Sequence, residues 1–284
     1  DGAWPPRKHY RRCICDAPDV RLDEPKYARV FKVKNRVQYR NKNNMENTGK
    51  PEVASSIERM SGAMEVINFA LKKVEQKYGT GFGDGESPKA YHNLLHTKNV
   101  LESAGKIAAL ALKNGKIIEG DIDLAQIAAS FHDIEQDLGG GANEEESVRL
   151  SQEEMNKTEA FELSDKEKVK KMILATIVSF ENGVLKQSAT DDYLTRIITD
   201  ADLSALGQPP ETYWATAQSL LKEMKKTDTP SYEDQLLWAQ GQIAYLSNHQ
   251  FYTDEARELF PHKEANIEFA KQQIKILEGE IKQN

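Results

Sequence analysis

The sequence predicts an all-α fold, a bundle of about eight or nine helices, on three observations. From about residue 53 onward, apolar residues recur at steps of three and four, the spacing that lines one helix face. The alternation that is typical of strands is almost absent after residue 50. Helix signals are also present, such as Ser164-Asp165-Lys166-Glu167, which matches a capping box. The expected helices cover about 53–78, 90–113, 121–137, 164–180, 191–203, 211–226, 231–249 and 263–281.

Charge divides the chain into two parts. Residues 1–52 carry 13 Lys and Arg against 7 Asp and Glu, whereas the rest of the chain carries 25 against 38. The first part lacks a sustained helical or strand period, so we expect a basic, poorly ordered arm over 1–52. A basic tether for RNA or acidic lipid is its functional alternative. Residues 53–284 form the predicted helical domain, whose acidic balance argues against nucleic acid as a partner.

Composition favours a cytoplasmic setting. Hydrophobic residues make up 39% of the chain and charged residues 29%. No run approaches the roughly 18–20 apolar residues of a membrane span, and no apolar leader segment opens the sequence, so no membrane partner is expected. Cys13 and Cys15 are too close in sequence to favour a disulfide, which is typical of a reducing compartment. A metal role for this pair would require two more ligands, and His9 is the obvious local candidate.

Two segments carry histidines with acidic or histidine neighbours. In Y-H-N-L-L-H, His92 and His96 are four residues apart, so on a helix they share one face. In I-A-A-S-F-H-D, the pair His132-Asp133 ends an apolar run. A buried ionised carboxylate is costly unless a cation or a hydrogen-bonded partner accompanies it. A helix-capping role is the structural alternative for this pair.

A third segment, T-D-A-D-L-S-A-L-G, supplies a further carboxylate. Asp200 and Asp202 point about 200° apart on a helix, and Asp202 is the better candidate for the inward direction. One imidazole of the first segment, His132, Asp133 and Asp202 would form a set of two histidines and two carboxylates. Such a set suits Mn²⁺, Fe²⁺, Zn²⁺ or Mg²⁺, and helical bundles build metal sites from ligands on several helices.

These segments resemble the HD superfamily of metal-dependent phosphohydrolases. His96, His132-Asp133 and Asp202 match its H…HD…D signature, and Y-H-N-L-L-H and A-D-L-S are similar to segments of cyclic-nucleotide phosphodiesterases. The closer resemblance is to bacterial predicted HD phosphohydrolases, which also carry an N-E-x-x-S segment, here at 143–147. The likeness covers about residues 55–280.

The resemblance implies an HD-domain helical bundle that hydrolyses a small phosphate mono- or diester, such as a nucleotide, with metal-activated water. His92 matches the histidine that acts as general acid towards the leaving oxygen in the phosphodiesterases. Glu144 would order a metal-bound water or hold His92, with a place in an acidic helix start as the alternative. One or two divalent ions are implied, and the implied metal ligands are His96, His132, Asp133 and Asp202.

The chain departs from the family's pattern in its histidines. The bacterial relatives carry a histidine where this chain has Ser179, and structural or solvent-facing roles are expected for His249 and His262. Asp133 could bridge to a second ion, but the few imidazoles favour one ion or a loosely bound pair. They also count against the superfamily's di-iron oxygenases. The lysines of K-E-M-K-K (222–226) are expected to face solvent, with phosphate contact as the alternative.

A second class of function stays open beside the enzyme. The chain could be a non-catalytic HD module that keeps the fold and the metal and acts by binding a nucleotide or a partner. The complete ligand set favours the enzyme. The sequence specifies neither the substrate, the metal nor the oligomeric state.

Overall fold

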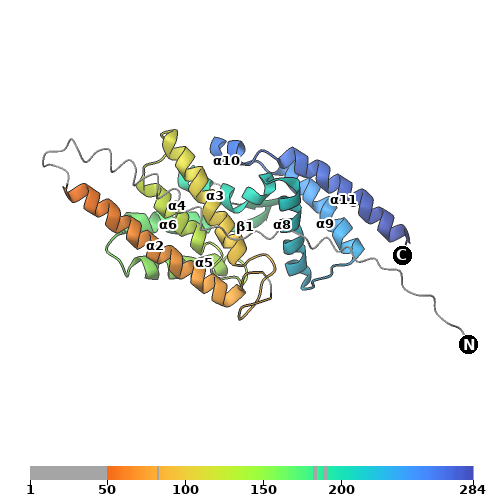
Figure 1. Cartoon of the computed structure of the whole chain (residues 1–284), viewed down its shortest axis with the longest axis horizontal. Helices are drawn as coiled ribbons and strands as arrows, with labels where there is room; N and C mark the ends of the chain where they lie inside the picture. The colour runs from red at the N-terminus through yellow and green to blue at the C-terminus, as the bar shows by residue number, and fades with distance from the viewer. Residues whose placement is uncertain (1–49, 82, 182–183, 188–190, 284) are drawn as a thin grey trace, which may run out of the picture. The chain divides into compact units, whose positions relative to one another are not determined.

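The computed structural model describes residues 50–81, 83–181, 184–187 and 191–283, so the arm predicted over 1–52 lies almost wholly outside the described residues (Figure 1). The described part is helical, which confirms the predicted all-α class. It contains ten α-helices where about eight or nine were expected, because two helices outside the expected ranges occupy 142–155 and 254–259. The helices are α2 (Lys50–Tyr78), α3 (Leu94–Lys113), α4 (Gly120–Phe131), α5 (Ala142–Met155), α6 (Leu163–Ala175), α7 (Tyr193–Asp202), α8 (Pro210–Lys225), α9 (Tyr232–Asn248), α10 (Asp254–Leu259) and α11 (Lys263–Gln283), with a 3₁₀ helix η1 (Ser204–Gly207) after α7.

Helix α3 begins later than the sequence predicted. Asn93 has an extended backbone, and its side chain accepts hydrogen bonds from the backbone N–H groups of Leu95 and His96, so it is the N-cap. His92 therefore precedes the helix, and the prediction that His92 and His96 share one helix face is wrong. The two rings still lie near each other, with centroids 5.8 Å apart.

The boundaries of α6 also differ from the prediction. Its capping box is formed by Glu162 and Asp165, not by Ser164 and Glu167. The helix ends at Ala175 instead of continuing through Phe180, because an antiparallel hairpin follows. Its strands are β1 (Val178–Glu181) and β2 (Val184–Gln187), with Val178 opposite Gln187.

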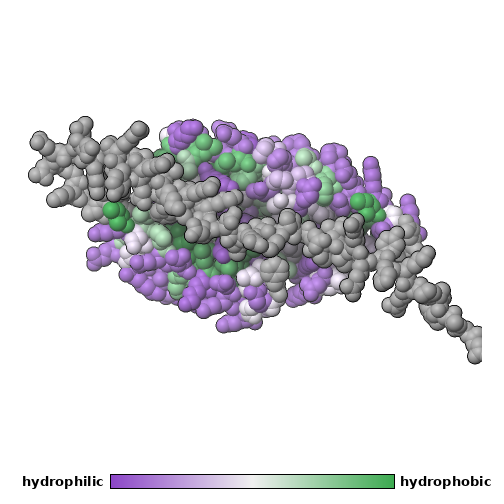
Figure 2. All heavy atoms as spheres, viewed as in Figure 1, coloured by the Kyte–Doolittle hydropathy of each residue, from purple (hydrophilic) through white to green (hydrophobic). Residues whose placement is uncertain are grey.

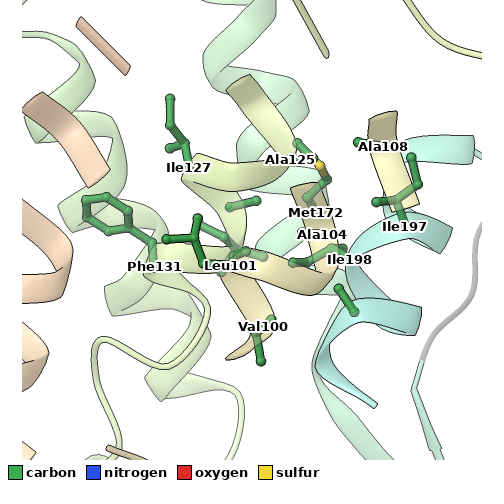
Figure 3. Packing of buried hydrophobic residues seen from close by; sticks show 14 of the residues in the cluster. Val100, Leu101, Ala104, Ala108, Ala125, Ile127, Phe131, Met172, Ile197 and Ile198 are labelled. Carbon is green, nitrogen blue, oxygen red and sulfur yellow. The ribbon is translucent and has the colours of Figure 1, made fainter. Parts of the chain in front are cut away.

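The core that positions the candidate site lies among α3, α4, α6 and α7. Helix α3 packs against α4 and α7, and α6 packs against both of those helices. Figure 3 shows aliphatic side chains from these helices meeting, among them Leu101, Met172 and Ile198. Fully buried alanines, such as Ala104 and Ala125, allow the helix backbones to approach closely. This packing brings the first turn of α3 to the C-terminal ends of α4 and α7.

Helices α8, α9 and α11 form a second group that lies side by side (Figure 1), with α11 packed on both α8 and α9. The connection from α7 reaches this group through η1, where His262 donates a backbone hydrogen bond to the carbonyl of Gly207. Figure 2 shows mainly hydrophilic residues over the described surface in that view. None of the helices that the structure describes combines the length and the apolar character that a membrane span requires.

Candidate metal centre

The structure brings His96, His132, Asp133 and Asp202 together at one point. His96 lies in the first turn of α3, His132 and Asp133 directly follow α4, and Asp202 is the last residue of α7. One ligand atom from each residue lies within 4.8 Å of the others, and the group could hold a metal ion. The H…HD…D segments thus converge in space. Asp133 follows the helix that was expected to carry it, because α4 ends at Phe131.

The separations between the ligand atoms suit a single ion. The Nε2 atoms of His96 and His132 are 3.2 Å apart. Asp133 Oδ2 is 3.0 Å from each of these nitrogens, and Asp202 Oδ1 is 3.4 Å from each. Ligands bound at about 2.0–2.1 Å to one ion lie about 2.8–3.0 Å apart along the edges of an octahedron and about 3.3–3.4 Å apart along those of a tetrahedron. The donor set therefore fits a divalent cation.

The ring of His132 is oriented by the end of its own helix. Its Nδ1 donates to the carbonyl oxygen of Ala129 over 2.8 Å, which directs Nε2 toward the cluster. The side chain is 1% exposed, and that of His96 is 7% exposed. Both imidazoles are thus held in a site from which water is largely excluded.

The pKa shifts of the cluster residues indicate that the site favours a bound proton or cation. Burial acts to lower the pKa of His96, but hydrogen bonding to Asp133 and Asp202 outweighs it and raises the pKa above its ordinary value. Burial acts to raise the pKa of Asp202, but hydrogen bonds from His132 and His96 hold it well below its usual range. Two ionised carboxylates in one buried site require a cation nearby, which a metal ion would supply.

The outer oxygens of the two carboxylates are each held by a glutamine that the sequence reasoning missed. Gln136 Nε2 donates to Asp133 Oδ1 over 2.8 Å. Gln187 Nε2, on β2, donates to Asp202 Oδ2 over 2.5 Å. The spacing of three residues between Asp133 and Gln136 could have indicated the first contact. The second depends on the hairpin, which was not predicted.

The two carboxylates of the cluster form part of the wall of a cavity of about 260 Å³. Asp133, Asp202 and Glu144 line its acidic part, and apolar residues such as Leu206 and Leu220 line another part. Two tyrosines, Tyr213 and Tyr245, lie on the helical group of α8 and α9, and the Tyr213 hydroxyl donates to Gln242 over 2.7 Å. None of the described residues that line the cavity is a lysine or an arginine.

His92 lies in the wall of this cavity and contacts an acid that the sequence reasoning missed. Its Nδ1 is 2.5 Å from Glu223 Oε1, and the backbone N–H groups of Tyr91 and His92 both donate to Glu223 Oε2. Burial acts to raise the pKa of Glu223, but the hydrogen bond with His92 outweighs it and lowers the pKa. Glu223 is therefore ionised and orients the ring. It belongs to K-E-M-K-K, where only the lysines were considered.

Glu144 also lines the cavity but does not take one of the roles predicted for it. Glu223 contacts the ring of His92, so the alternative in which Glu144 holds His92 is wrong. Burial raises the pKa of Glu144, and its buried Oε2 has no hydrogen-bond partner in the described structure. An orphaned carboxylate oxygen beside the cluster is consistent with the predicted contact to a water, which stays a prediction.

The other candidate side chains lie in structural positions. Asp200 accepts hydrogen bonds from the backbone of Tyr252 and from Thr253 before α10, so it stabilises that turn. His249 packs against Phe251, and its buried Nδ1 has no partner among the described residues. The Lys225 side chain pairs with an aspartate on α9. The side chain of Ser179 lies outside the described residues.

Comparison with known proteins adds no family to this geometry: no family model matches the chain, and no curated protein matches it significantly. The chemistry that the site could perform therefore rests on its own residues. The four ligand atoms could hold a cation at the wall of a cavity, and a carboxylate-held histidine faces the same cavity. Hydrolysis assisted by a metal ion is the reaction class that such a pairing favours.

Proposed function

We propose that the chain is a metal-dependent phosphohydrolase of the HD superfamily that acts on a small phosphate mono- or diester. The observation that carries the proposal is the convergence of His96, His132, Asp133 and Asp202 beside a cavity whose wall includes both of these carboxylates and His92. A divalent ion of the Mn, Fe, Zn or Mg type fits this donor set. When bound, the ion supplies an activated water and polarises the phosphoryl oxygen.

The residues around the cluster have distinct roles in this proposal. His92 donates a proton to the departing oxygen from its Nε2, because its Nδ1 is engaged by Glu223. Glu223 holds the ring through Nδ1 and so leaves Nε2 free to face the substrate. Glu144, with its unpartnered oxygen on the cavity, orders the water that attacks phosphorus.

The cavity indicates the kind of ester that it would take. Because no lysine or arginine occurs among its described lining residues, the bound ion would neutralise the phosphoryl group. A single phosphate fits this arrangement better than a polyphosphate. Tyr213, Tyr245 and Gln242 suit an uncharged ring with hydrogen-bonding edges, which is the chemistry of a nucleoside.

Metal content should be measured alongside hydrolysis of an aryl phosphate and an aryl phosphodiester in Mn²⁺. We expect hydrolysis by the wild-type chain and its loss in His132→Ala and Asp133→Ala, with His262→Ala as the matched control at an exposed histidine. Activity that survives both substitutions at the cluster would refute the proposal. Tight binding of a nucleotide without any product would instead favour the non-catalytic module.

A further inference from the structure

We propose that Gln136 and Gln187 restrict the centre to one metal ion, because each of them occupies the outer oxygen of one cluster carboxylate. This inference rests on the proposed metal centre. Sites for two ions hold them about 3.5–4 Å apart and commonly share a carboxylate between them. The oxygen that would bind the second ion is therefore the one that points away from the first.

At Asp133, the two oxygens have different partners. Oδ2 lies 3.0 Å from the Nε2 atoms of both cluster histidines. Oδ1 accepts a hydrogen bond of 2.8 Å from the side-chain amide of Gln136. An amide N–H directs partial positive charge at this oxygen, so a cation that approached it would have to displace the hydrogen bond.

The position of Gln136 is itself fixed by the loop that follows α4. Its backbone N–H donates to the hydroxyl oxygen of Tyr78 over 2.7 Å, and that hydroxyl donates to Glu135 over 3.1 Å. Lys77 also binds Glu135, over 2.7 Å. The amide of Gln136 is thus presented to Asp133 by an anchored turn, which lowers the entropy cost of the contact.

At Asp202, the same arrangement is built from the hairpin. Oδ1 faces the two histidines at 3.4 Å, while Oδ2 accepts a hydrogen bond of 2.5 Å from Gln187. The Gln187 side chain is buried, and its Nε2 also lies 3.4 Å from the carbonyl oxygen of Thr176. Two glutamines from different elements therefore hold the outer oxygens of both carboxylates.

The rest of the cavity offers little to a second ion. Among the described residues, His96, His132, Asp133 and Asp202 are the one group whose ligand atoms converge. Glu144 supplies a single carboxylate on the cavity, and Glu223 is occupied by His92 and by backbone N–H groups. Gln136 and Gln187 are thus positioning residues, which leave each carboxylate one oxygen for the ion.

The number of bound ions tests this inference. The full chain would be dialysed against Mn²⁺, its metal counted by elemental analysis, and its Mn²⁺ spectrum recorded by electron paramagnetic resonance. We expect one ion per chain and the six-line spectrum of an isolated Mn²⁺. In Gln136→Glu, a carboxylate replaces the amide donor, so we expect two ions and an exchange-coupled spectrum. Gln272→Glu, at an exposed position on α11, is the matched control and should keep one ion.

Two ions in the wild-type chain, one ion in Gln136→Glu, or no ion in either would overturn the inference. If Gln136→Glu does not fold, as judged by circular dichroism, Gln187→Ala takes its place. It frees Asp202 Oδ2, so a second ion should then be counted in Gln187→Ala. Metal counting is independent of hydrolysis. If the wild-type chain binds one ion but does not hydrolyse the esters, only the proposed function is refuted. If it binds two ions and hydrolyses them, only this inference is refuted.

Discussion

The two histidines of Y-H-N-L-L-H should differ in their effect on metal binding when each is replaced by alanine. His96 places its Nε2 among the four converging ligand atoms, so His96→Ala removes a ligand. His92 contacts Glu223 instead, so His92→Ala should leave the ligand set complete. Thermal unfolding with and without Mn²⁺ measures the difference, because an ion that binds the folded chain stabilises it.

The size of the effect follows from linkage. With Mn²⁺ at 100 times its dissociation constant, the ion stabilises the folded chain by about 2.7 kcal/mol. Even contacts beyond the ligands change metal affinity by roughly 10- to 100-fold, so the loss of a ligand should cost at least about 100-fold. The remaining stabilisation at the same Mn²⁺ concentration is then about 0.4 kcal/mol. At roughly 2–4 °C per kcal/mol, the Mn²⁺-induced rise in Tm falls from about 5–11 °C to about 1–2 °C.

The comparison needs four proteins: wild type, His96→Ala, His92→Ala and His262→Ala. His262 is exposed, so its substitution controls for the loss of an imidazole elsewhere on the chain. We expect the full Mn²⁺ shift in wild type, His92→Ala and His262→Ala. A full shift in His96→Ala, or its loss in His92→Ala, would refute the assignment of the two histidines.

Glu223→Gln should lower kcat by up to roughly 100-fold with little change in KM or metal content, because it weakens the hold on His92; an unchanged kcat contradicts this. Burial and nearby Lys263 lower the pKa of His249 in the folded chain to about 4. The unfolded chain therefore binds a proton at this histidine at a higher pH than the folded chain does, so the stability present above pH 6.5 is lost as the pH falls toward 4. In urea unfolding, wild type should therefore lose about 2–3 kcal/mol relative to His249→Phe between pH 7 and 4.5, and equal pH dependence would rule out this origin. Gly207→Ala should destabilise the chain by at least about 1–3 kcal/mol, because its Cβ would lie 2.1 Å from the carbonyl oxygen of Phe260. Gly241→Ala, with open space around it on α9, should stabilise by up to about 1 kcal/mol, and similar effects in the two glycine variants would contradict the packing argument.

The all-α class and the four converging side chains could be predicted from the sequence because both depend on local signals. Helical periodicity is repeated over many turns, and His132-Asp133 ends an apolar run. The direction of Asp202 followed from its place directly before the apolar Leu203 and one turn before Leu206. The choice of His96 over His92 as the ligand, however, came from the resemblance and not from spacing.

The parts that could not be predicted depend on contacts between distant segments. His92 and Glu223 are 131 residues apart in sequence, and no local pattern distinguishes this glutamate from a solvent-facing one. Asn93 could have been recognised as an N-cap, which would have placed His92 outside α3. The hairpin had a signal as well, because the pair Asn182-Gly183 between its strands favours a two-residue turn.

The hairpin of β1 and β2 should also affect metal affinity, although it carries none of the four ligands. Gln187 is the last residue of β2, so its contact with Asp202 exists only while the hairpin is docked on the site. The two equilibria are coupled reciprocally. If docking of the hairpin raises the affinity for the ion by some factor, binding of the ion raises the equilibrium constant for docking by the same factor. Amide hydrogens of β1 and β2 should therefore exchange more slowly once the ion is bound, which would couple the order of this segment to the occupancy of the centre.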